Sequence, residues 1–333
     1  HGRGLTMRPL VDDVEALTVV LADGEVVRCS REENAELFSL VVGGYGLFGV
    51  IATVTLRLGE RMKLRRLVNI MDIDEAVPAF YRRVAEGCLY GDFQYAIDPE
   101  DHDFLRRGVL AVYARAPDGA QETDASAALT GEQWIKLLEL ALNAKGRAFQ
   151  VYGQHYLSTH GNVYWSDTMQ LSTYLPTYVE VLARAPGSTP GESLVIGEMY
   201  TPPDRLLEFL DRSRGILRET RAEDIYGTIR AIRKDETTFL PWAKEDFGCV
   251  IFNLRTRHAP EGLAQTTEVF RRLNQAALDL GGSFFLTYHR AATREQIECA
   301  YPSFPEFLRA KRRYDPNLRF QSEWWKHHAR MFE

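Results

Sequence analysis

Three stretches of alternating apolar and polar residues carry side chains of the kind that move protons and hold developing charge. Their period of two is typical of a strand with one face on helices and the other on a ligand. A carboxylate, a guanidinium, a thiol and tyrosine hydroxyls on such faces suit acid–base and electrostatic catalysis. A solvated strand face with ordinary cross-strand charge pairs is the alternative interpretation. The polar residues that share a face are Glu198 and Tyr200 within 194–200, Tyr226, Thr228 and Arg230 within 225–232, and Cys249, Asn253 and Arg255 within 249–255.

A second feature with chemical meaning is a cluster of glycines, Gly43, Gly44, Gly46 and Gly49, directly before the β-branched run 50–55. Glycine serves where the backbone must approach a ligand closely or take a positive φ. The pattern therefore predicts a loop pressed against a flat ligand, followed by a strand. A simple turn before a strand would give the same pattern, so the surrounding motifs have to decide.

Motifs on the N-terminal side of this loop occur in a characteristic order. The pair His1-Gly2 comes first, then a hairpin pattern around residues 22–25, then Glu-Leu-Phe at 36–38. Together with the glycines, this order resembles the second half of the FAD-binding domain in the vanillyl-alcohol oxidase, or PCMH-type, family of FAD-linked oxidoreductases. The resemblance implies FAD as the cofactor. It also implies a partner, namely the first FAD subdomain with its pyrophosphate-binding loop, as part of the same gene product or as a separate chain.

The resemblance continues near the C-terminus. Residues 281–316 are similar without gaps to the decaprenylphosphoryl-ribose oxidases of that family, including Tyr301-Pro302 and the run 311–316. The implied fold class is α+β: the second half of a PCMH-type FAD-binding domain, plus an antiparallel-sheet substrate, or cap, domain with helices on one face. The implied domains are 1–60 in the FAD-binding domain, 61–290 in the cap domain, and 291–333 as a C-terminal helix and tail that return to the FAD domain.

The resemblance also assigns roles to individual residues. Arg230 falls where the ribose oxidases have an active-site lysine, and Glu198 falls on a glutamine of the pocket. Tyr288 replaces a lysine important for catalysis, so it keeps a proton donor and loses a fixed charge. The expected catalytic residues are Arg230, Tyr288 and Glu198; the expected cofactor-binding residues are His1, Gly2, Gly43, Gly44, Gly46, Gly49, Val50, Ile51 and Phe285; and the expected substrate-binding residues are Gln94, Tyr174, Cys249, Asn253 and His289.

The predicted reaction is oxidation of a hydroxyl-bearing carbon in a sugar-, polyol- or alcohol-like small molecule, with flavin as the hydride acceptor. Such a reaction needs a base for the hydroxyl proton, for which Tyr288 and His289 are the candidates, and a donor where negative charge develops, which suits Arg230. Arg230 could equally anchor the substrate or pair with Glu198. Two alternatives remain: a reductase of a carbon–carbon double bond, like the sterol Δ24-reductases, and a non-catalytic chain without flavin.

Composition limits the classes of function. The net charge of −6 and the lack of a long basic stripe argue against nucleic-acid binding. No run approaches the roughly 18 apolar residues of a membrane span, and a cytoplasmic location is expected. The four cysteines are scattered, without metal-ligand spacing, so we expect no metal site.

Local patterns predict the elements that position these residues. Asp23-Gly24 between two β-branched runs predicts a hairpin. Thr130 with Gln133 predicts a capping box for a helix over 131–142, whose apolar side carries Trp134, Leu137, Leu138 and Ala141. Further helices are predicted over 202–218, 261–280 and 294–313, and a strand over 283–287.

Overall fold

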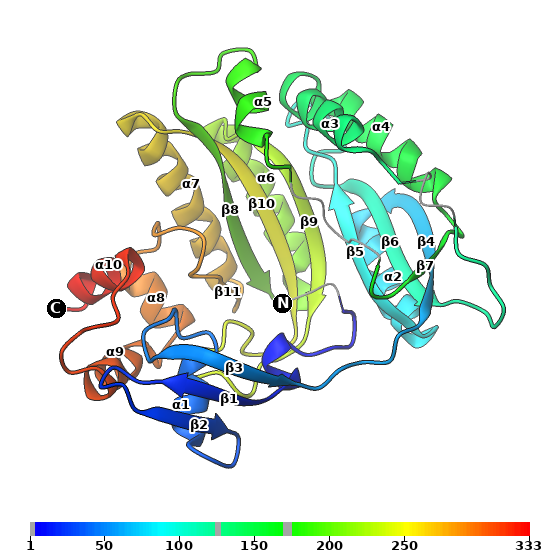
Figure 1. The fold of residues 1–333 in the computed structure, drawn as a ribbon. Helices are drawn as coiled ribbons and strands as arrows, with labels where there is room; N and C mark the ends of the chain where they lie inside the picture. Colours follow the sequence, from blue (N-terminus) through cyan, green and yellow to red (C-terminus); the bar gives the residue numbers. More distant parts are fainter. Residues whose placement is uncertain (1–3, 124–127, 169–174) are drawn as a thin grey trace.

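The computed structural model of this protein describes residues 4–123, 128–168 and 175–333. Within them the chain forms a three-stranded and an eight-stranded antiparallel sheet with helices packed around them (Figure 1), so the predicted α+β class is confirmed. The strands are β1 (Val14–Val20), β2 (Val26–Ser30), β3 (Val50–Leu56), β4 (Lys63–Asp72), β5 (Cys88–Tyr95), β6 (Arg107–Arg115), β7 (Val163–Trp165), β8 (Glu192–Thr201), β9 (Asp224–Ile232), β10 (Phe247–Arg257) and β11 (Ser283–Phe284). The helices are α1 (Ala35–Val41), α2 (Ile73–Ala85), α3 (Gly131–Asn143), α4 (Lys145–Ser158), α5 (Tyr178–Arg184), α6 (Leu206–Thr220), α7 (Pro260–Leu278), α8 (Arg294–Ala300), α9 (Phe304–Tyr314) and α10 (Glu323–Met331), with 3-10 turns at Leu10–Asp13 and Pro203–Arg205.

The small sheet has the order β2-β1-β3, and its first two strands form the predicted hairpin. Gly24 in the turn has a φ of +97°, a conformation that favours glycine. Every residue of β3 is exposed, including the apolar Val50 and Ile51 at 56% and 44% exposure. An apolar edge strand of this kind is a surface on which another element can pack.

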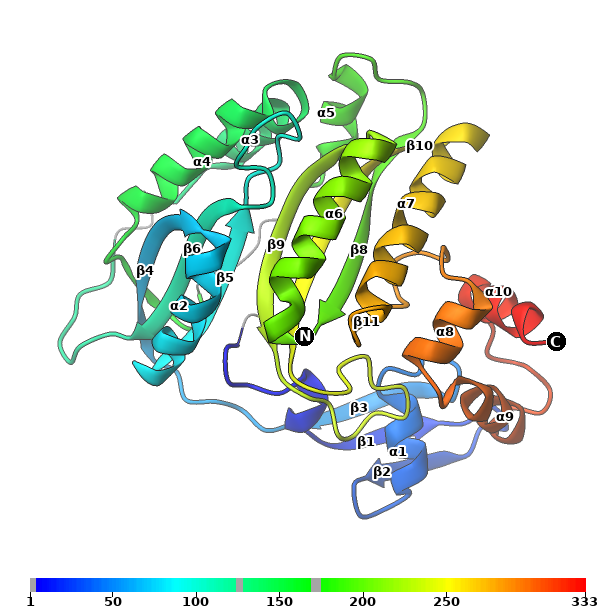
Figure 2. The same cartoon turned by 180° about the vertical axis from the view of Figure 1, so that it is seen from behind.

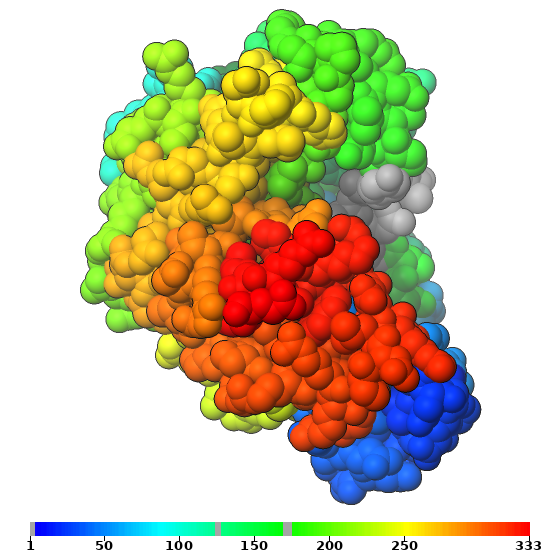
Figure 3. Space-filling model, turned by 90° about the vertical axis from the view of Figure 1, so that its left-hand side faces the viewer, coloured from blue at the N-terminus to red at the C-terminus, as the bar shows by residue number. Residues whose placement is uncertain are grey.

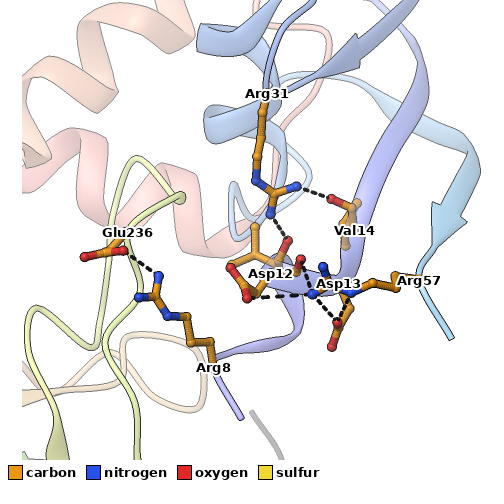
Figure 4. A network of polar contacts seen from close by, with 8 residues as sticks. Arg8, Asp12, Asp13, Val14, Arg31, Arg57 and Glu236 are labelled. Carbon is orange, nitrogen blue, oxygen red and sulfur yellow. Dashed lines mark hydrogen bonds and ion pairs between the residues drawn. The ribbon is translucent and has the colours of Figure 1, made fainter. Parts of the chain in front are cut away.

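Arginine side chains fasten the N-terminal segment to the small sheet and to the loop between β9 and β10 (Figure 4). Arg31 donates to the carbonyls of Val11 and Val14, each at 2.7 Å. Arg57 pairs with Asp13, and Arg8 pairs with Glu236 of the β9–β10 loop. These contacts set the small sheet against one end of the large sheet.

The large sheet has the order β11-β8-β10-β9-β5-β6-β4-β7. Helices α2, α6 and α7 lie on one face (Figure 2), while α3 and α4 lie over the other (Figure 1). Alternate residues of β6 separate the two layers: Leu110 and Val112 belong to the main core, whereas Val109 and Ala111 pack against α4. A helix pair therefore covers part of the face opposite the main helical layer.

The two halves of the large sheet meet at a short junction between β5 and β9. One residue pair, Phe93 and Ile229, is in register there. Thr228 donates to Asp92 at 3.0 Å and strengthens the junction. Gly227 is required for close approach, because a Cβ at this position would lie 1.7 Å from the hydroxyl of Tyr95.

Most predicted elements are present, with informative exceptions. The capping box of Thr130 and Gln133 is confirmed at the start of α3. The helix predicted over 294–313 is wrong as a single element, because Tyr301 leaves helical geometry before Pro302 and separates α8 from α9. A residue before proline is disfavoured in the α region, which explains the break. The strand predicted over 283–287 is shorter than expected, and α4 and α10 were not predicted.

The glycine loop between α1 and β3 has two kinds of glycine. Gly43 and Gly46 have φ values of +74° and +71°. A Cβ at Gly44 would lie 1.8 Å from the carbonyl oxygen of Leu40, and a Cβ at Gly49 would lie 2.4 Å from Cγ1 of Val19. Internal packing therefore explains Gly44 and Gly49 without a ligand, whereas Gly46 has no atom within 4 Å of its would-be Cβ.

The C-terminal residues return to the N-terminal part of the chain, as Figure 3 shows where the last segments lie against the first. Lys311 on α9 is fully buried and donates to the carbonyl of Leu47 in the glycine loop at 2.9 Å and to Asp315. Arg319 donates to the carbonyl of Ala22 at 2.7 Å. The motif 311–316 is therefore a fastening between the C-terminus and the glycine loop.

A comparison of Gly44 and Gly46 tests the distinction between loop glycines required by close packing and those required only by a positive φ. Gly44→Ala should lower the free energy of unfolding by about 3 kcal/mol or more, because the methyl group has no room. Gly46→Ala should cost only about 1–2 kcal/mol, since its cost is the positive φ alone. Denaturant unfolding of both variants provides the measurement, and equal losses would contradict the assignment.

The buried pair on α9 gives a second prediction. Lys311→Met removes the cation and leaves the buried Asp315 with only the backbone N–H groups of Arg319 and Phe320 as donors. Loss of one partner of a buried ion pair typically costs about 3–5 kcal/mol. Arg309→Met on the same helix is the matched control, because Arg309 pairs with Glu306 at the surface and exposed pairs contribute about 0–1 kcal/mol. Urea unfolding of the two variants measures the difference, and similar stabilities would show that the fastening has no energetic role.

Candidate functional site

A cavity of about 560 Å³ lies between the large sheet and helices α3, α4 and α5. Its floor comes from β5, β8, β9 and β10, and the segment after β11 adds Tyr288. The polar residues of its lining include Gln94, Glu198, Tyr226, Arg230, Asn253 and Tyr288, and its apolar residues include Trp134, Leu137, Leu138, Phe149, Leu194 and Ile196. The structure thus brings all three predicted catalytic residues to one cavity, together with Gln94 and Asn253.

Glu198 is the central acidic group of this cavity. It lies on β8 opposite Ile251 of β10 and is 3% exposed. The hydroxyls of Tyr200 and Tyr288 donate to its two carboxylate oxygens at 2.8 and 3.0 Å. Burial raises the pKa of Glu198, while these two hydrogen bonds and the charge of Arg230 oppose the rise. The result is a carboxyl group whose pKa lies above its ordinary value, which favours proton exchange nearer neutral pH.

Arg230 and Cys249 are neighbours across β9 and β10 and flank Glu198. Burial raises the pKa of the Cys249 thiol well above its ordinary value, so this residue is a neutral thiol. Its Sγ atom lies 4.0 Å from a carboxylate oxygen of Glu198. The Nε atom of Arg230 is buried and has no hydrogen-bond partner among the described residues. A buried donor of this kind is available for a ligand.

The segment after β11 connects the cavity with the glycine loop. The amide of Phe285 donates to the carbonyl of Glu198 at 3.0 Å, which holds this segment beside β8. Tyr45 of the glycine loop hydrogen-bonds the side chain of Thr287, one residue before Tyr288. Burial also raises the pKa of Tyr288, so its hydroxyl stays protonated and donates to Glu198. Tyr45 of the glycine loop therefore contacts the residue that precedes Tyr288, which donates to Glu198.

The loop is fixed from its other side by the C-terminal tail. Tyr45 has a φ of +57° and stacks on Trp324 with ring centroids 3.9 Å apart. Trp324 in turn donates to the carbonyl of Leu286 at 3.0 Å. Non-glycine residues keep a positive φ where surrounding contacts hold them. The C-terminal tail and the segment beside the cavity therefore hold Tyr45 in this conformation together.

A second buried carboxyl group, Asp224, supports the opposite end of the cavity. Its carboxylate accepts from the backbone N–H of Asn253 at 3.0 Å and from the hydroxyl of Tyr95 at 2.9 Å. Lys145, at the start of α4, donates to the carbonyl of Asp224 at 2.6 Å. Burial raises the pKa of Asp224 to about 7. This cluster holds the helix pair α3–α4 to β9.

Several predicted site residues lie away from this cavity or outside the described structure. His289 does not belong to the described lining: its ring stacks on Phe270 at 4.0 Å, and burial lowers its pKa to about 4. Phe285 packs against Trp242 and Tyr288 beside the cavity. The predicted residues His1, Gly2 and Tyr174 lie outside the described residues.

Three further features concern ions, membranes and missed residues. In the described ranges, no group of three or more His, Cys, Asp or Glu side chains is placed to hold a metal ion. No helix in those ranges is long and apolar enough to cross a membrane. Sequence reasoning gave no role to Tyr200 and Asp224. Tyr200 shares a strand face with Glu198, which was the available signal, whereas nothing local marks Asp224.

Comparison with known proteins gives partial matches to named oxidoreductases. Cytokinin dehydrogenase 4 of Oryza sativa subsp. japonica is 36% identical over 73 residues, which is 22% of this chain and 14% of that protein. Cytokinin dehydrogenase 2 of Arabidopsis thaliana is 44% identical over 66 residues, or 20% and 13%. An uncharacterized oxidoreductase, ORF5 in the fasciation locus of Rhodococcoides fascians, is 47% identical over 58 residues, or 17% and 12%. No family model matches the chain.

These matches cover a small part of each protein, 12–14% of the three relatives' own lengths. All three relatives are named as dehydrogenases or oxidoreductases, which confirms the predicted relation to oxidoreductases at that general level. The finer resemblance to vanillyl-alcohol and ribose oxidases is not among these matches.

The buried Asp224 predicts a pH dependence of stability. Its pKa in the folded chain is about 7, against an ordinary value of 3.8, so the folded state keeps a proton that the unfolded state has released. The free energy of unfolding should therefore fall as pH rises from about 4 to about 7. Asp224→Asn should remove much of this decline, whereas Asp118→Asn at an exposed turn should leave it unchanged. Unfolding at a series of pH values provides the measurement, and an unaltered slope in Asp224→Asn would contradict the prediction.

Proposed function

We propose that this chain belongs to an FAD-linked oxidoreductase that oxidises a hydroxyl-bearing carbon of a small alcohol- or sugar-like molecule. The observation that carries the proposal is a buried carboxyl group, Glu198, held by two tyrosine hydroxyls at one end of a cavity. The partial matches to dehydrogenases and an oxidoreductase support the reaction class.

The chain's own residues fit FAD at the glycine loop. Gly46 leaves its backbone open, with no atom within 4 Å of a would-be Cβ, and Gly43 has only Thr238 near it, at 3.8 Å. A backbone with such space can approach a flat ring system closely. FAD also agrees with the kind of relatives that the chain matches. When bound, FAD would supply the hydride acceptor.

The first FAD subdomain remains the proposed partner. The exposed Val50 and Ile51 on β3 offer an apolar surface of the kind that a neighbouring subdomain covers. In this arrangement the same strand that follows the glycine loop also carries the subdomain contact. The partner would thereby be held next to the loop on which FAD is proposed to lie.

Four polar residues at the acidic end of the cavity then have chemical roles. Glu198 accepts the hydroxyl proton of the substrate as the carbon gives up its hydride, and the substrate becomes a carbonyl compound. Tyr288 and Tyr200 orient the carboxylate and stabilise its charged form. Arg230 binds the substrate oxygen with its Nε–H, which has no partner among the described residues, or stabilises the developing negative charge. Glu198 takes the place of His289 as the proposed base, because His289 is packed on Phe270.

The names of two relatives favour a second candidate substrate, a cytokinin. Two alternatives to the proposed oxidase are a double-bond reductase and a non-catalytic chain without flavin. Flavin bands in the absorption spectrum of the full-length protein would exclude the non-catalytic chain. Bleaching of those bands by alcohols would support the proposed oxidase, bleaching by a cytokinin the second candidate substrate, and bleaching by NAD(P)H the reductase.

Replacing the proposed base provides the decisive variant. Glu198→Gln keeps the shape and removes the proton acceptor, so flavin reduction in the FAD-loaded full-length protein should slow by about 10²–10⁴-fold. Arg230→Met should slow it by about 10²-fold through loss of one preorganised donor. Glu180→Gln, at a carboxylate exposed on α5, is the control and should reduce flavin at the normal rate. Stopped-flow absorbance measures all three, and normal rates in Glu198→Gln and Arg230→Met would exclude the proposed roles.

A further inference from the structure

Helix α3 presents an apolar stripe that the protein buries only in part. Thr130 caps the helix, and Trp134, Leu137, Leu138 and Ala141 recur at the spacing of one helical face. In α3, which is described throughout, Ala141 is the one buried residue. All four residues of the stripe line the cavity. A stripe of this kind normally packs into a core, so its position over a cavity calls for an apolar occupant.

Apolar groups also line the opposite walls of this part of the cavity. Phe149 and the ring of Tyr152, both on α4, line it, and Leu194 and Ile196 of β8 form part of the floor. Leu194 and Ile196 share a strand face with Glu198, since residues two apart point the same way. Leu194 is four residues from Glu198, which is roughly 13 Å along a strand. The cavity thus has an acidic end at Glu198 and an apolar end at Leu194.

Contacts at Asp224 place the helix pair over the apolar end. In the register of the sheet, Asp224 lies opposite Leu254, which is in turn opposite Val195. Lys145, which directly follows the α3–α4 turn, donates to the carbonyl of Asp224. The end of α3 is therefore held at the Leu194 end of β8, away from Glu198.

The charges of the lining also limit the occupant. Among the described lining residues, Glu198 and Arg230 are the two with formal charges, and both contribute to the acidic end. No cation lines the apolar end among the described residues, and the nearby ammonium of Lys145 donates to the carbonyl of Asp224. An unpaired charge is costly to move from water into such a place. A phosphate or carboxylate at the far end of a substrate would therefore be excluded.

We propose that the substrate is an uncharged molecule whose reacting carbon lies at Glu198 and whose elongated apolar group extends along β8 beneath α3. Trp134 is the specificity-determining residue for that group, because it is the largest side chain of the stripe. The assignment of the reacting end rests on the proposed function. The apolar end rests on the stripe of α3 and the charges of the lining.

Calorimetric binding of simple alcohols tests the proposal without turnover. The probes are 1-octanol, 1-hexanol, glycerol and 8-hydroxyoctanoate. Octanol should bind the chain more tightly than hexanol, by about three- to fourfold per methylene. Glycerol and 8-hydroxyoctanoate, which carries a charge at the far end, should each bind at least tenfold more weakly than octanol. The proposal is overturned if octanol does not bind, or if 8-hydroxyoctanoate binds as well as octanol.

Variants of α3 locate the binding. Trp134→Ala should weaken octanol binding by about tenfold, the equivalent of about 55 Å² of lost apolar contact. Glu139→Ala, on the exposed side of the same helix, is the matched control and should bind normally. Leu138→Ala provides a second variant in case Trp134→Ala does not fold, as judged by circular dichroism. Normal octanol binding by folded Trp134→Ala or Leu138→Ala would show that α3 does not contact the ligand.

Flavin reduction by the same alcohols separates this proposal from the proposed function. Octanol that binds through Trp134 while no alcohol reduces flavin in the full-length protein would leave the apolar site standing and overturn the oxidation of alcohols. Glycerol that reduces flavin as efficiently as octanol, with a rate that depends on Glu198, would support the reaction and overturn the apolar substrate class.

Discussion

A carboxylate inside a sheet must be given hydrogen-bond donors, and much of this structure is arranged around that requirement at Glu198. Desolvation of a charged group without partners would cost more than a typical domain can tolerate. Tyr200 supplies one donor from the same strand, and Tyr288 supplies the other from a segment ninety residues away. The amide of Phe285 donates to the carbonyl of Glu198 and helps to hold the segment after β11, and with it the second donor, beside β8.

That requirement links the cavity to the rest of the molecule. The segment carrying Tyr288 touches the glycine loop through Thr287 and Tyr45, and Trp324 of the C-terminal tail stacks on Tyr45. Lys311, buried on α9, holds the same loop through the carbonyl of Leu47. Parts of the chain that are far apart in sequence therefore meet at one place, where a displaced glycine loop would also displace a donor of Glu198. These contacts are the physical connection between the glycine loop and the cavity.

The cavity combines two environments that conflict in a packed core. At its acidic end two tyrosine hydroxyls donate to Glu198, while at its apolar end the stripe of α3 is only partly buried. A protein that only needed stability would pack α3 onto the sheet, because closely packed interiors gain dispersion energy and remove apolar surface from water. The proposed uncharged, elongated substrate satisfies both ends at once. The names of the partial relatives support the proposed reaction class, and the lining of this chain supports the proposed substrate class.

Local sequence determined much of the secondary structure, because its signals act over a few residues. Asp23-Gly24 specified the hairpin turn, Thr130 and Gln133 specified the start of α3, and alternation placed Glu198, Arg230 and Asn253 on faces that line one cavity. Pro302, which disfavours a helical conformation at Tyr301, was a local signal that the prediction of a single helix overlooked. Tertiary structure alone decided what these faces meet. The pattern of α3 predicted an apolar face but not whether this face covers a core or a cavity. The sequence made His289 a candidate base, and only the tertiary structure showed that its ring packs on Phe270. Gly44 and Gly49 are required by packing within the protein, because a Cβ at these positions would clash with the carbonyl of Leu40 and the side chain of Val19. Burial, close approach and pKa depend on residues distant in sequence, and for that reason they could not be deduced from spacing within one strand or helix.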